Sequence, residues 1–490
     1  MDHKAFLIEA HRAEKTAPTS GPFRPAFHLA PPTGWLNDPN GLCQWENTTH
    51  IFFQYNPLDL KPGNFNYWGH YTTEDFITYT LHQPALSCDT DADANGVYSG
   101  SAVVEEDQLR LYYTGNVKHP GNHDYTHTGR EHNTMTVVSK DGIHFTHKEI
   151  VMTNADYPVD ETLHVRDPKV FDFNGIPTMV LGARTNDDVG EVLLYQKIGD
   201  QWALKNRLRT KEPFGYMWEC PDLFTLEGQT FLSVSPQGVD ADGYHYQNIY
   251  QSGTFKISGD PTGDCSISDF TEYDQGFDFY APQTYLDNQG RRILIAWMGL
   301  PDVPYDNPTT NEGWMHMLTM PRILSVNESG KMCQAPLTEL KKLRQNKKNL
   351  RLHGQDVTWK GKAPCEIILS NVNPASHFSV TLGQDCKIIW DGTVIALCFG
   401  ASGCGRKIRQ AQLNTVYRLH LFIDHSSIEC FVNDGSTVFT SRYYPQTEEA
   451  GITFSGMAIQ ANIWPLKNFN YSCCSDWNNV EDTISNDSNA

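Results

Sequence analysis

The segment NDPNGLCQWENTTHIFFQYN (37–56) consists of two apolar strands around a polar turn, and this pattern recurs four times further along the chain. The later copies are YSGSAVVEEDQLRLYYTGN (98–116), RDPKVFDFNGIPTMVLGAR (166–184), ECPDLFTLEGQTFLSVSPQG (219–238) and YAPQTYLDNQGRRILIAWMG (280–299). The second strands are expected to begin near His50, Gln108, Ile176, Gln229 and Arg292, at intervals of 58, 68, 53 and 63 residues. Hairpins repeated at such intervals predict small sheets stacked around an axis, as in a five-bladed β-propeller.

A side chain suited to chemistry stands immediately before the first strand of every unit. These side chains are Asp38, Ser99, Asp167, Glu219 and Tyr280. If the first strands line the axis, their starts meet at one mouth of a central funnel. Look-alike hairpins also arise in any all-β chain, but three acids at equivalent strand starts favour a shared site.

The pattern changes after residue 322, where the polar segment QAPLTELKKLRQNKKNL (334–350) indicates a linker. Alternating strands resume in YRLHLFIDHSSIECFV (417–432) and predict a β-sandwich. We therefore expect an all-β protein in five parts: an N-terminal extension (1–23), a five-bladed propeller (24–330), a linker (331–350), a C-terminal β-sandwich (351–474) and a polar, disordered tail (475–490).

Composition excludes several classes of partner. The formal charge of −20 over 490 residues, without any run of Lys or Arg, argues against nucleic acid. The sequence shows neither a signal peptide nor an apolar stretch long enough to span a membrane. The 12 cysteines form no CxxC pair and suggest reduced thiols. We expect a cytoplasmic protein that binds a small molecule, and its oligomeric state stays open.

The first acid, Asp38, stands in the turn segment WLNDPNG (35–41). Cleavage of a glycosidic bond requires one ionised carboxylate at the anomeric carbon and one carboxylic acid beside the leaving oxygen. The amides of Asn37 and Asn40 are expected to keep Asp38 charged and oriented. Asp38 is therefore the predicted nucleophile.

The other two acids stand in contrasting settings. Glu219 lies between Trp218 and Cys220, an apolar setting that predicts a proton donor. Asp167 follows Arg166, whose guanidinium is expected to hold it ionised. Taken singly, each of these dipeptides is an ordinary turn, so the prediction depends on the three acids together.

Five motifs in order resemble those of the invertase and sucrose-6-phosphate hydrolase family of glycoside hydrolases, the β-fructofuranosidases. They are HLAPPTGWLNDPNG (28–41), YSGSAV (98–103), VRDPKVF (165–171), WECPDLF (218–224) and DFYAPQ (278–283). The segment FIDHSSIECFVNDG (422–435) is similar to the β-sandwich that this family carries. The resemblance covers nearly the whole chain except its ends.

The resemblance implies a five-bladed propeller and retention of configuration. Hydrolysis by two carboxylates needs no metal, and no cofactor is expected. The resemblance also implies a fructosyl intermediate on Asp38, acid/base catalysis by Glu219 and transition-state stabilisation by Asp167. Residues that match the family's fructosyl pocket are Asn37, Gln54, Trp68, Tyr98, Ser99, Arg166, Tyr280 and Trp297. For Trp68 and Trp297, packing in the core is as reasonable an interpretation as contact with sugar.

The predicted activity is hydrolysis of terminal β-D-fructosyl residues of sucrose, sucrose 6-phosphate or short fructo-oligosaccharides. A fructosyltransferase that discharges the same intermediate onto a sugar is one alternative. A non-catalytic sugar-binding protein is another, and the three acids argue against it.

Two further features bear on the leaving group. Within HPGNHDYTHTGREH (119–132), His123 and His127 have a spacing that could hold zinc on a helix. Pro120 and two glycines would break such a helix, so we predict a loop over the pocket without a metal.

A phosphate on the leaving sugar would need converging cations. The candidates Lys118, Arg130 and Arg184 have the acidic neighbours Asp124, Glu131, Asp187 and Asp188, which are expected to offset their charge. Only a modest preference for a 6-phosphate is therefore predicted.

Overall fold

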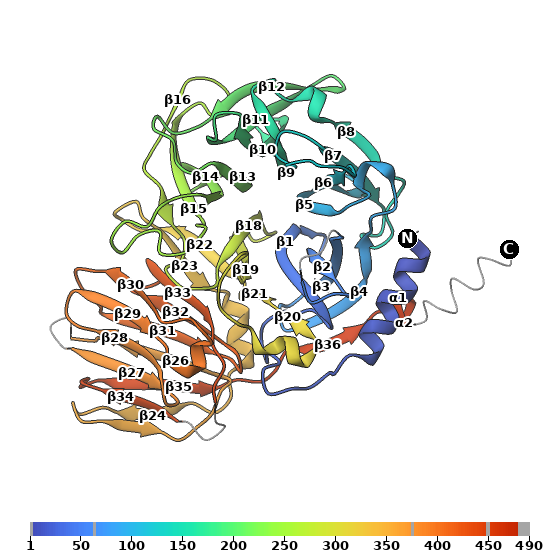
Figure 1. The fold of residues 1–490 in the computed structure, drawn as a ribbon. Helices are drawn as coiled ribbons and strands as arrows, with labels where there is room; N and C mark the ends of the chain where they lie inside the picture. The colour runs from blue at the N-terminus through green and yellow to red at the C-terminus, as the bar shows by residue number, and fades with distance from the viewer. Residues whose placement is uncertain (1–2, 62–64, 374–376, 447–450, 479–490) are drawn as a thin grey trace.

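Strands dominate the computed structural model, which describes residues 3–61, 65–373, 377–446 and 451–478 (Figure 1). In this part of the chain the strands form seven sheets. The helices are α1 (His3–Thr16) and α2 (Ser475–Asn478), with short turns η1 (Asp91–Asp93), η2 (Asn154–Asp156), η3 (Pro308–Glu312), η4 (Thr338–Leu343) and η5 (Ala401–Gly403). The expectation of a mostly β protein is confirmed.

Five of the sheets follow one another along the chain. The first contains β1 (Gly34–Trp45), β2 (Thr48–Asn56), β3 (Tyr67–Thr73), β4 (Thr78–Leu86), β20 (Trp314–Met315) and β36 (Asn470–Cys473). The second contains β5 (Val97–Glu105), β6 (Gln108–Lys118), β7 (Arg130–Ser139) and β8 (Glu149–Met152). The third contains β9 (Glu161–Phe173), β10 (Ile176–Thr185), β11 (Gly190–Ile198) and β12 (Gln201–Leu208).

The fourth and fifth sheets complete this series. The fourth contains β13 (Met217–Leu226), β14 (Gln229–Gln237), β15 (Gly253–Gly259), β16 (Cys265–Ile267) and β17 (Thr271–Glu272). The fifth contains β18 (Tyr280–Leu286), β19 (Arg292–Met298), β21 (Met317–Leu318), β22 (Arg322–Val326) and β23 (Met332–Pro336). The second strand of each unit begins within two residues of the position expected from the sequence.

Buried apolar clusters lie between consecutive sheets and join them face to face. Representative pairs, from the first and second sheets onward, are Phe52 with Leu111, Tyr112 with Leu181, Leu194 with Leu232, Phe231 with Leu294, and Ile295 with Ile51. The last pair joins the fifth sheet to the first. The five sheets are therefore arranged around a common centre, with β1, β5, β9, β13 and β18 innermost (Figure 1).

Each innermost strand has a register shift near its start. The shifts lie at Leu36/Pro39 in β1, Val97/Gly100 in β5, Arg166/Lys169 in β9, Glu219/Asp222 in β13 and Tyr280/Gln283 in β18. A bulge bends its strand and redirects one side chain. The repeated shifts thus turn the strand-start side chains toward the centre of the ring.

The remaining two sheets have six strands each and share one apolar core. One contains β24 (Lys348–Arg351), β26 (Cys365–Ser370), β31 (Arg418–Ile423), β32 (Ser427–Val432), β33 (Thr437–Arg442) and β35 (Gln460–Pro465). The other contains β25 (Val357–Trp359), β27 (Phe378–Leu382), β28 (Cys386–Trp390), β29 (Val394–Cys398), β30 (Ile408–Gln412) and β34 (Ile452–Ser455).

The structure moves several of the expected boundaries. Strand β23 pairs with β22, so the fifth sheet continues to Pro336, beyond residue 330. Strand β36 pairs with β4 of the first sheet instead of extending the C-terminal pair of sheets. Residues 475–478 form helix α2, in which Trp477 is buried, and residues 479–490 lie outside the described part of the chain. The N-terminal segment forms helix α1, whose Phe6 packs in the large core cluster.

Candidate active site

Asp38 lies at the register shift of β1 and receives hydrogen bonds from two side chains. Ser99 Oγ donates to Asp38 Oδ2 at 2.5 Å, and Asn37 Nδ2 donates to Oδ1 at 3.2 Å. Burial and the charge of Glu219 raise the pKa of Asp38 to about 6, against the opposing hydrogen bonds from Ser99 and Asn37. The carboxyl group is therefore mostly ionised at neutral pH.

Asp167 lies on β9 with a positive φ of 64°, an uncommon conformation for a non-glycine residue. Its backbone N–H donates to Thr114 Oγ1 at 2.9 Å, and its Oδ2 accepts from the Cys220 backbone N–H at 2.9 Å. Burial raises the pKa of Asp167 to about 7, because the charge of Arg166 only partly offsets it. Strained backbone held in this way is typical of functional sites.

Glu219 lies on β13, where three donors from different elements converge on its carboxyl group. Arg166 Nη2 donates to Oε1 at 2.7 Å, while Gln237 Nε2 and the Tyr280 hydroxyl each donate to Oε2 at 2.6 Å. The side chain keeps 16% of its surface exposed. Glu219 is therefore fixed in direction and still accessible to a ligand.

Cys220 connects the other two acids. Its Sγ lies 3.6 Å from Asp38 Oδ2 and 3.7 Å from Asp167 Oδ2. Its φ of 47° turns the thiol toward the centre at the bulge of β13. The three acids predicted from the sequence thus meet at one place, on strands that are more than 50 residues apart in the chain.

Two local expectations about the acids are wrong, and a third holds in part. Asn40 Nδ2 donates to the main-chain oxygen of Asp38 at 3.3 Å and leaves the carboxylate alone. Trp218 is buried in a core cluster, so the carboxyl group of Glu219 lies among polar donors instead of apolar groups. The third concerns Arg166, which binds Glu219 at 2.7 Å and has its Nε 3.9 Å from Asp167; its charge lowers the pKa of Asp167, but burial raises that pKa by more. Neighbours in a strand point to opposite faces, so Trp218 does not surround the carboxyl group of Glu219.

Most of the other predicted site residues also border this centre. Gln54 Nε2 donates to the Val97 carbonyl at 2.9 Å and Trp68 Nε1 donates to the Tyr98 carbonyl at 3.1 Å, so both hold the start of β5. Trp68 is fully buried in a core cluster, which favours the packing interpretation. The Trp297 ring lies 6.2 Å from that of Tyr280.

Gln237, Thr114 and His164 also contact the site and were missed in the sequence. Gln237 and Thr114 stand near the ends of β14 and β6. In an antiparallel hairpin, the end of the second strand lies beside the start of the first. Residues near the ends of the second strands in the five repeats could therefore have been predicted to lie near the strand-start side chains. His164 contacts Arg166 Nη1 through Nδ1 at 2.6 Å, and nothing in its sequence context indicates this contact.

The His-rich segment 119–132 forms a loop followed by β7, without a helix. His127 Nδ1 lies 3.2 Å from Asp124 Oδ2 and His123 Nδ1 lies 3.4 Å from Thr128 Oγ1. Within residues 3–61, 65–373, 377–446 and 451–478, no group of three His, Cys, Asp or Glu side chains is arranged to hold a metal ion. None of the twelve cysteines is in a disulfide. No helix among the described residues is long and apolar enough to cross a bilayer.

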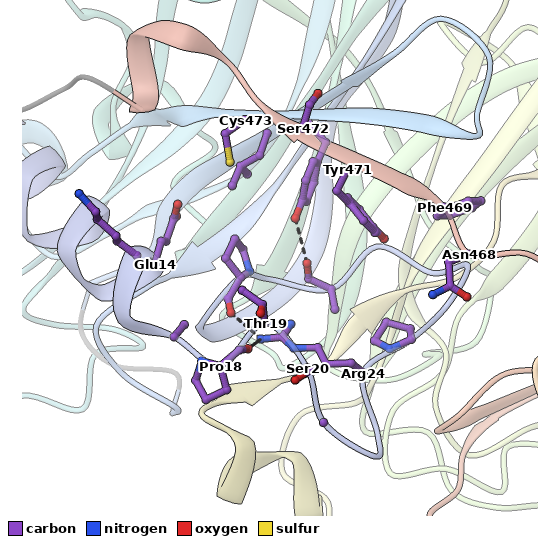
Figure 2. Close-up of a pocket in the computed structure, with 18 of the residues that line it drawn as sticks. Glu14, Pro18, Thr19, Ser20, Arg24, Asn468, Phe469, Tyr471, Ser472 and Cys473 are labelled. Carbon is purple, nitrogen blue, oxygen red and sulfur yellow. Dashed lines mark hydrogen bonds between the residues drawn. The ribbon is translucent and has the colours of Figure 1, made fainter.

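A pocket of about 620 Å³ lies away from the three acids, between the N-terminal segment and β36 (Figure 2). Glu14 borders it and accepts hydrogen bonds from Tyr55 at 2.8 Å and Trp477 at 2.7 Å. Arg24 donates to the carbonyls of Pro31 at 2.6 Å and Pro32 at 2.5 Å. These bonds join both ends of the chain to the first sheet.

Comparison with known proteins fits this geometry. The profile of the glycosyl hydrolases family 32 N-terminal domain matches residues 28–336, and the profile of the family 32 C-terminal part matches residues 399–469. The chain belongs to glycosyl hydrolase family 32. Within this family it is 39% identical to a sucrose-6-phosphate hydrolase of Bacillus subtilis, covering 94% of this chain and 97% of the relative. It is 36% identical to a raffinose invertase of Escherichia coli, covering 95% and 100%.

Solved family 32 structures have the same fold. A β-fructofuranosidase of Bombyx mori aligns with a TM-score of 0.80 at 28% identity, covering 96% of this chain and 99% of that one. A sucrose-6-phosphate hydrolase of Lactobacillus gasseri aligns with a TM-score of 0.83 at 25% identity, covering 96% and 98%. This family 32 member is thus a glycoside hydrolase, and three acids meet at the centre of its first five sheets.

Proposed function

We propose that this protein is a retaining β-fructofuranosidase that hydrolyses terminal β-D-fructosyl residues of sucrose, sucrose 6-phosphate or short fructo-oligosaccharides. One observation carries the proposal: Asp38, Asp167 and Glu219 converge at the inner ends of three separate sheets. In a family of glycoside hydrolases, such a set supplies both the nucleophile and the proton donor.

The first five sheets form a five-bladed β-propeller in this proposal, and the last two form a β-sandwich. The five clusters between consecutive sheets support the first assignment. A single core between two six-stranded sheets supports the second. A closed ring of sheets keeps the inner strands rigid, which favours precise placement of the acids.

In the first chemical step, a carboxylate oxygen of Asp38 attacks the anomeric carbon of the fructosyl unit. The bond from that carbon to the glycosidic oxygen breaks, and Glu219 gives its proton to the departing oxygen. Asp38 suits the nucleophilic role because its Oδ2 is fixed by Ser99 at 2.5 Å. Arg166, Gln237 and Tyr280 hold Glu219 in a constant direction for proton transfer.

In the second step, the Glu219 carboxylate takes a proton from water while the water oxygen attacks the same carbon. The ester bond to Asp38 breaks, fructose leaves and both carboxyl groups return to their initial states. Asp167 stabilises the electron-poor carbon and binds fructosyl hydroxyls. Its own backbone and side chain are fixed by Thr114 and Cys220, which fits a group whose contacts strengthen in the transition state.

A substrate panel tests the proposal. Purified protein is incubated separately with sucrose, sucrose 6-phosphate, kestose and inulin, and released fructose is measured. We expect fructose from sucrose or its 6-phosphate, faster than from inulin. NMR of the first-released anomer should show retained configuration.

Three results would overturn this proposal. Absence of fructose from all four compounds would favour a non-catalytic sugar-binding protein. Inversion at the anomeric carbon would exclude Asp38 as nucleophile. Predominant oligosaccharide formation at high sucrose would instead identify a fructosyltransferase.

A further inference from the structure

Two cations face each other on neighbouring strands at the rim of the active site. Lys118 is the last residue of β6, and Arg130 is the first residue of β7, and the two are direct partners in the antiparallel pair. Like charges placed directly opposite each other destabilise a strand pair. Both side chains are only partly buried, so a ligand can reach them.

The two acids expected to offset Arg130 bind other groups. Glu131 Oε1 lies 2.8 Å from His119 Nε2, and its Oε2 accepts from Asn133. Asp124 Oδ1 accepts the backbone N–H groups of residues 126, 127 and 128 at 3.0, 2.9 and 3.0 Å. In the described part of the chain, no carboxylate lies within ion-pair distance of Arg130. The sequence-based reason for expecting only a weak phosphate site is therefore wrong for this residue.

Arg184 behaves differently, as the sequence predicted. Its Nη2 lies 2.6 Å from Asp188 Oδ1, and its guanidinium stacks on Tyr216 with the carbon 4.7 Å from the ring centre. Its charge is therefore neutralised locally. Arg184 supplies a nearby comparison for Arg130.

A line of contacts leads from Arg130 to the proposed proton donor. Arg130 Nη1 lies 3.1 Å from His132 Nε2, and the His132 ring lies 5.5 Å from that of His164. His164 Nδ1 lies 2.6 Å from Arg166 Nη1. The other terminal nitrogen of the same guanidinium, Nη2, donates a hydrogen bond to Glu219. Glu219 must stand beside the oxygen of the leaving group. The line therefore extends outward on the leaving-group side.

The two histidines on this line add no charge of their own at neutral pH. Burial lowers the pKa of His132 well below its usual value, and the charges of Arg130 and Arg166 lower it further. Burial and the charges of Arg166 and Arg130 lower the pKa of His164 in the same way. Positive potential thus accumulates on this side of the site, in a protein whose net charge is −20.

We propose that Arg130, supported by Lys118, is the specificity-determining residue that binds a phosphate carried by the leaving sugar, as in sucrose 6-phosphate. A phosphate dianion offsets two facing cations, and a guanidinium offers it paired N–H donors. A neutral leaving sugar gives Arg130 no such partner. The proposal rests on the β-fructofuranosidase function and names the leaving group that the site prefers.

Steady-state kinetics of Arg130→Gln test the assignment. We expect kcat/KM for sucrose 6-phosphate to fall by about 10- to 100-fold, the range for losing a hydrogen bond to a charged group, while kcat/KM for sucrose falls by less than about threefold. Arg130→Lys keeps the charge and should lose less than Arg130→Gln. Arg184→Gln is the matched control, because it removes an arginine of the same rim that is already paired, and it should change the ratio of the two kcat/KM values by less than about threefold.

Product inhibition gives a second readout that does not depend on turnover of the phosphorylated substrate. Glucose 6-phosphate should inhibit sucrose hydrolysis by the unaltered enzyme more strongly than glucose. In Arg130→Gln this inhibition should weaken about tenfold or more, whereas inhibition by fructose should persist because its subsite retains Asp38 and Asp167.

Several outcomes would overturn the phosphate site. Equal losses for sucrose and sucrose 6-phosphate in Arg130→Gln would show a general structural role. Equal changes in the Arg130 and Arg184 variants would show a diffuse field instead of a binding residue. If the enzyme releases fructose from sucrose but Arg130→Gln leaves kcat/KM for sucrose 6-phosphate unchanged, only the phosphate site is wrong. If neither substrate releases fructose, the proposed function is wrong.

Discussion

The active centre and the contact between the propeller and the sandwich both bury several charged side chains, but they balance these charges differently. At the contact, Arg322 Nη2 lies 2.5 Å from Glu429 Oε2, and His28 lies 2.7 Å from Asp424 and 2.9 Å from Glu429. At the active centre, Arg166 pairs with Glu219 at 2.7 Å and lies 3.9 Å from Asp167, while Asp38 is held by hydrogen bonds from Ser99 and Asn37. The contact matches its charges, whereas the centre retains excess negative charge.

The pKa values express this difference. Burial raises the pKa of Asp38 to about 6 and that of Asp167 to about 7. Burial acts in the same direction on Glu429, but the charge of Arg322 and the hydrogen bond from His28 outweigh it and lower the pKa. The contrast therefore holds between Asp38 and Asp167 at the centre and Glu429 and Asp424 at the contact, whereas burial still raises the pKa of Asp274 beside Arg322.

The largest expected effect is on turnover. Asp38→Ala removes the proposed nucleophile and should lower kcat by at least about 10⁴-fold. Glu219→Ala removes the proposed proton donor and should lower kcat by about 10²- to 10⁴-fold, with the fold retained in both variants. Activity assays with a good leaving group and added azide check the roles. Azide should restore activity to Glu219→Ala only, and the reverse pattern would exchange the two assignments.

The next effect is on stability at the contact between the domains. Arg322→Met leaves Glu429 and Asp274 buried without their guanidinium and should lower the free energy of unfolding by about 3 to 5 kcal/mol. Arg110→Met is the control, because its partner Glu105 is 35% exposed and the pair contributes at most about 1 kcal/mol. Urea unfolding measures both. Similar small losses in the two variants would remove the distinction between the regions.

The sequence predicted the three acids because strand starts repeat at recognisable intervals. It predicted their immediate partners poorly, because the partners lie on other strands: Ser99 and Tyr280 reach Asp38 and Glu219 from neighbouring sheets, and Gln237 reaches Glu219 from the next strand of the same sheet. The bulges that redirect side chains also have no clear local signature. Cys220 needs a φ of 47° to contact two acids, and nothing in WECPDLF (218–224) shows this conformation.

The pH profile should report the ionisation of Asp38. Because the nucleophile must be ionised, log kcat/KM for sucrose should fall with decreasing pH below about 6, approaching a tenfold loss per pH unit. Ser99→Ala removes a hydrogen bond that lowers the pKa of Asp38, so this acid limb should move to higher pH. If the acid limb of the Ser99→Ala profile stayed at the same pH, the ionisation that causes this limb would not be that of Asp38.

The smallest expected effect is a gain in stability in Asp167→Asn. It is also the clearest test of the difference between the active centre and the contact between propeller and sandwich. The folded-state pKa of Asp167 is raised to about 7 from 3.8, so its ionisation costs stability fully above pH 7 and not at all below about pH 3.8. Asp167→Asn should therefore unfold about 1 to 3 °C higher than the unaltered protein at pH 8, which is on the order of 1 kcal/mol, while losing kcat. Thermal unfolding at several pH values should show this gain shrinking as the pH falls toward 4.

The matched variant at the domain contact should behave in the opposite way. The hydrogen bond and charge of His28 outweigh burial and lower the pKa of Asp424, so its ionised form stabilises the fold above its ordinary pKa, and this contribution is lost only on acidification through the lowered value. Asp424→Asn should therefore unfold at a lower temperature than the unaltered protein at pH 8, because the variant weakens the bonds to His28 and to the backbone N–H groups of Ala26 and Phe27. If both substitutions shifted the unfolding temperature in the same direction, surplus and matched buried carboxylates would not differ in their cost to the fold.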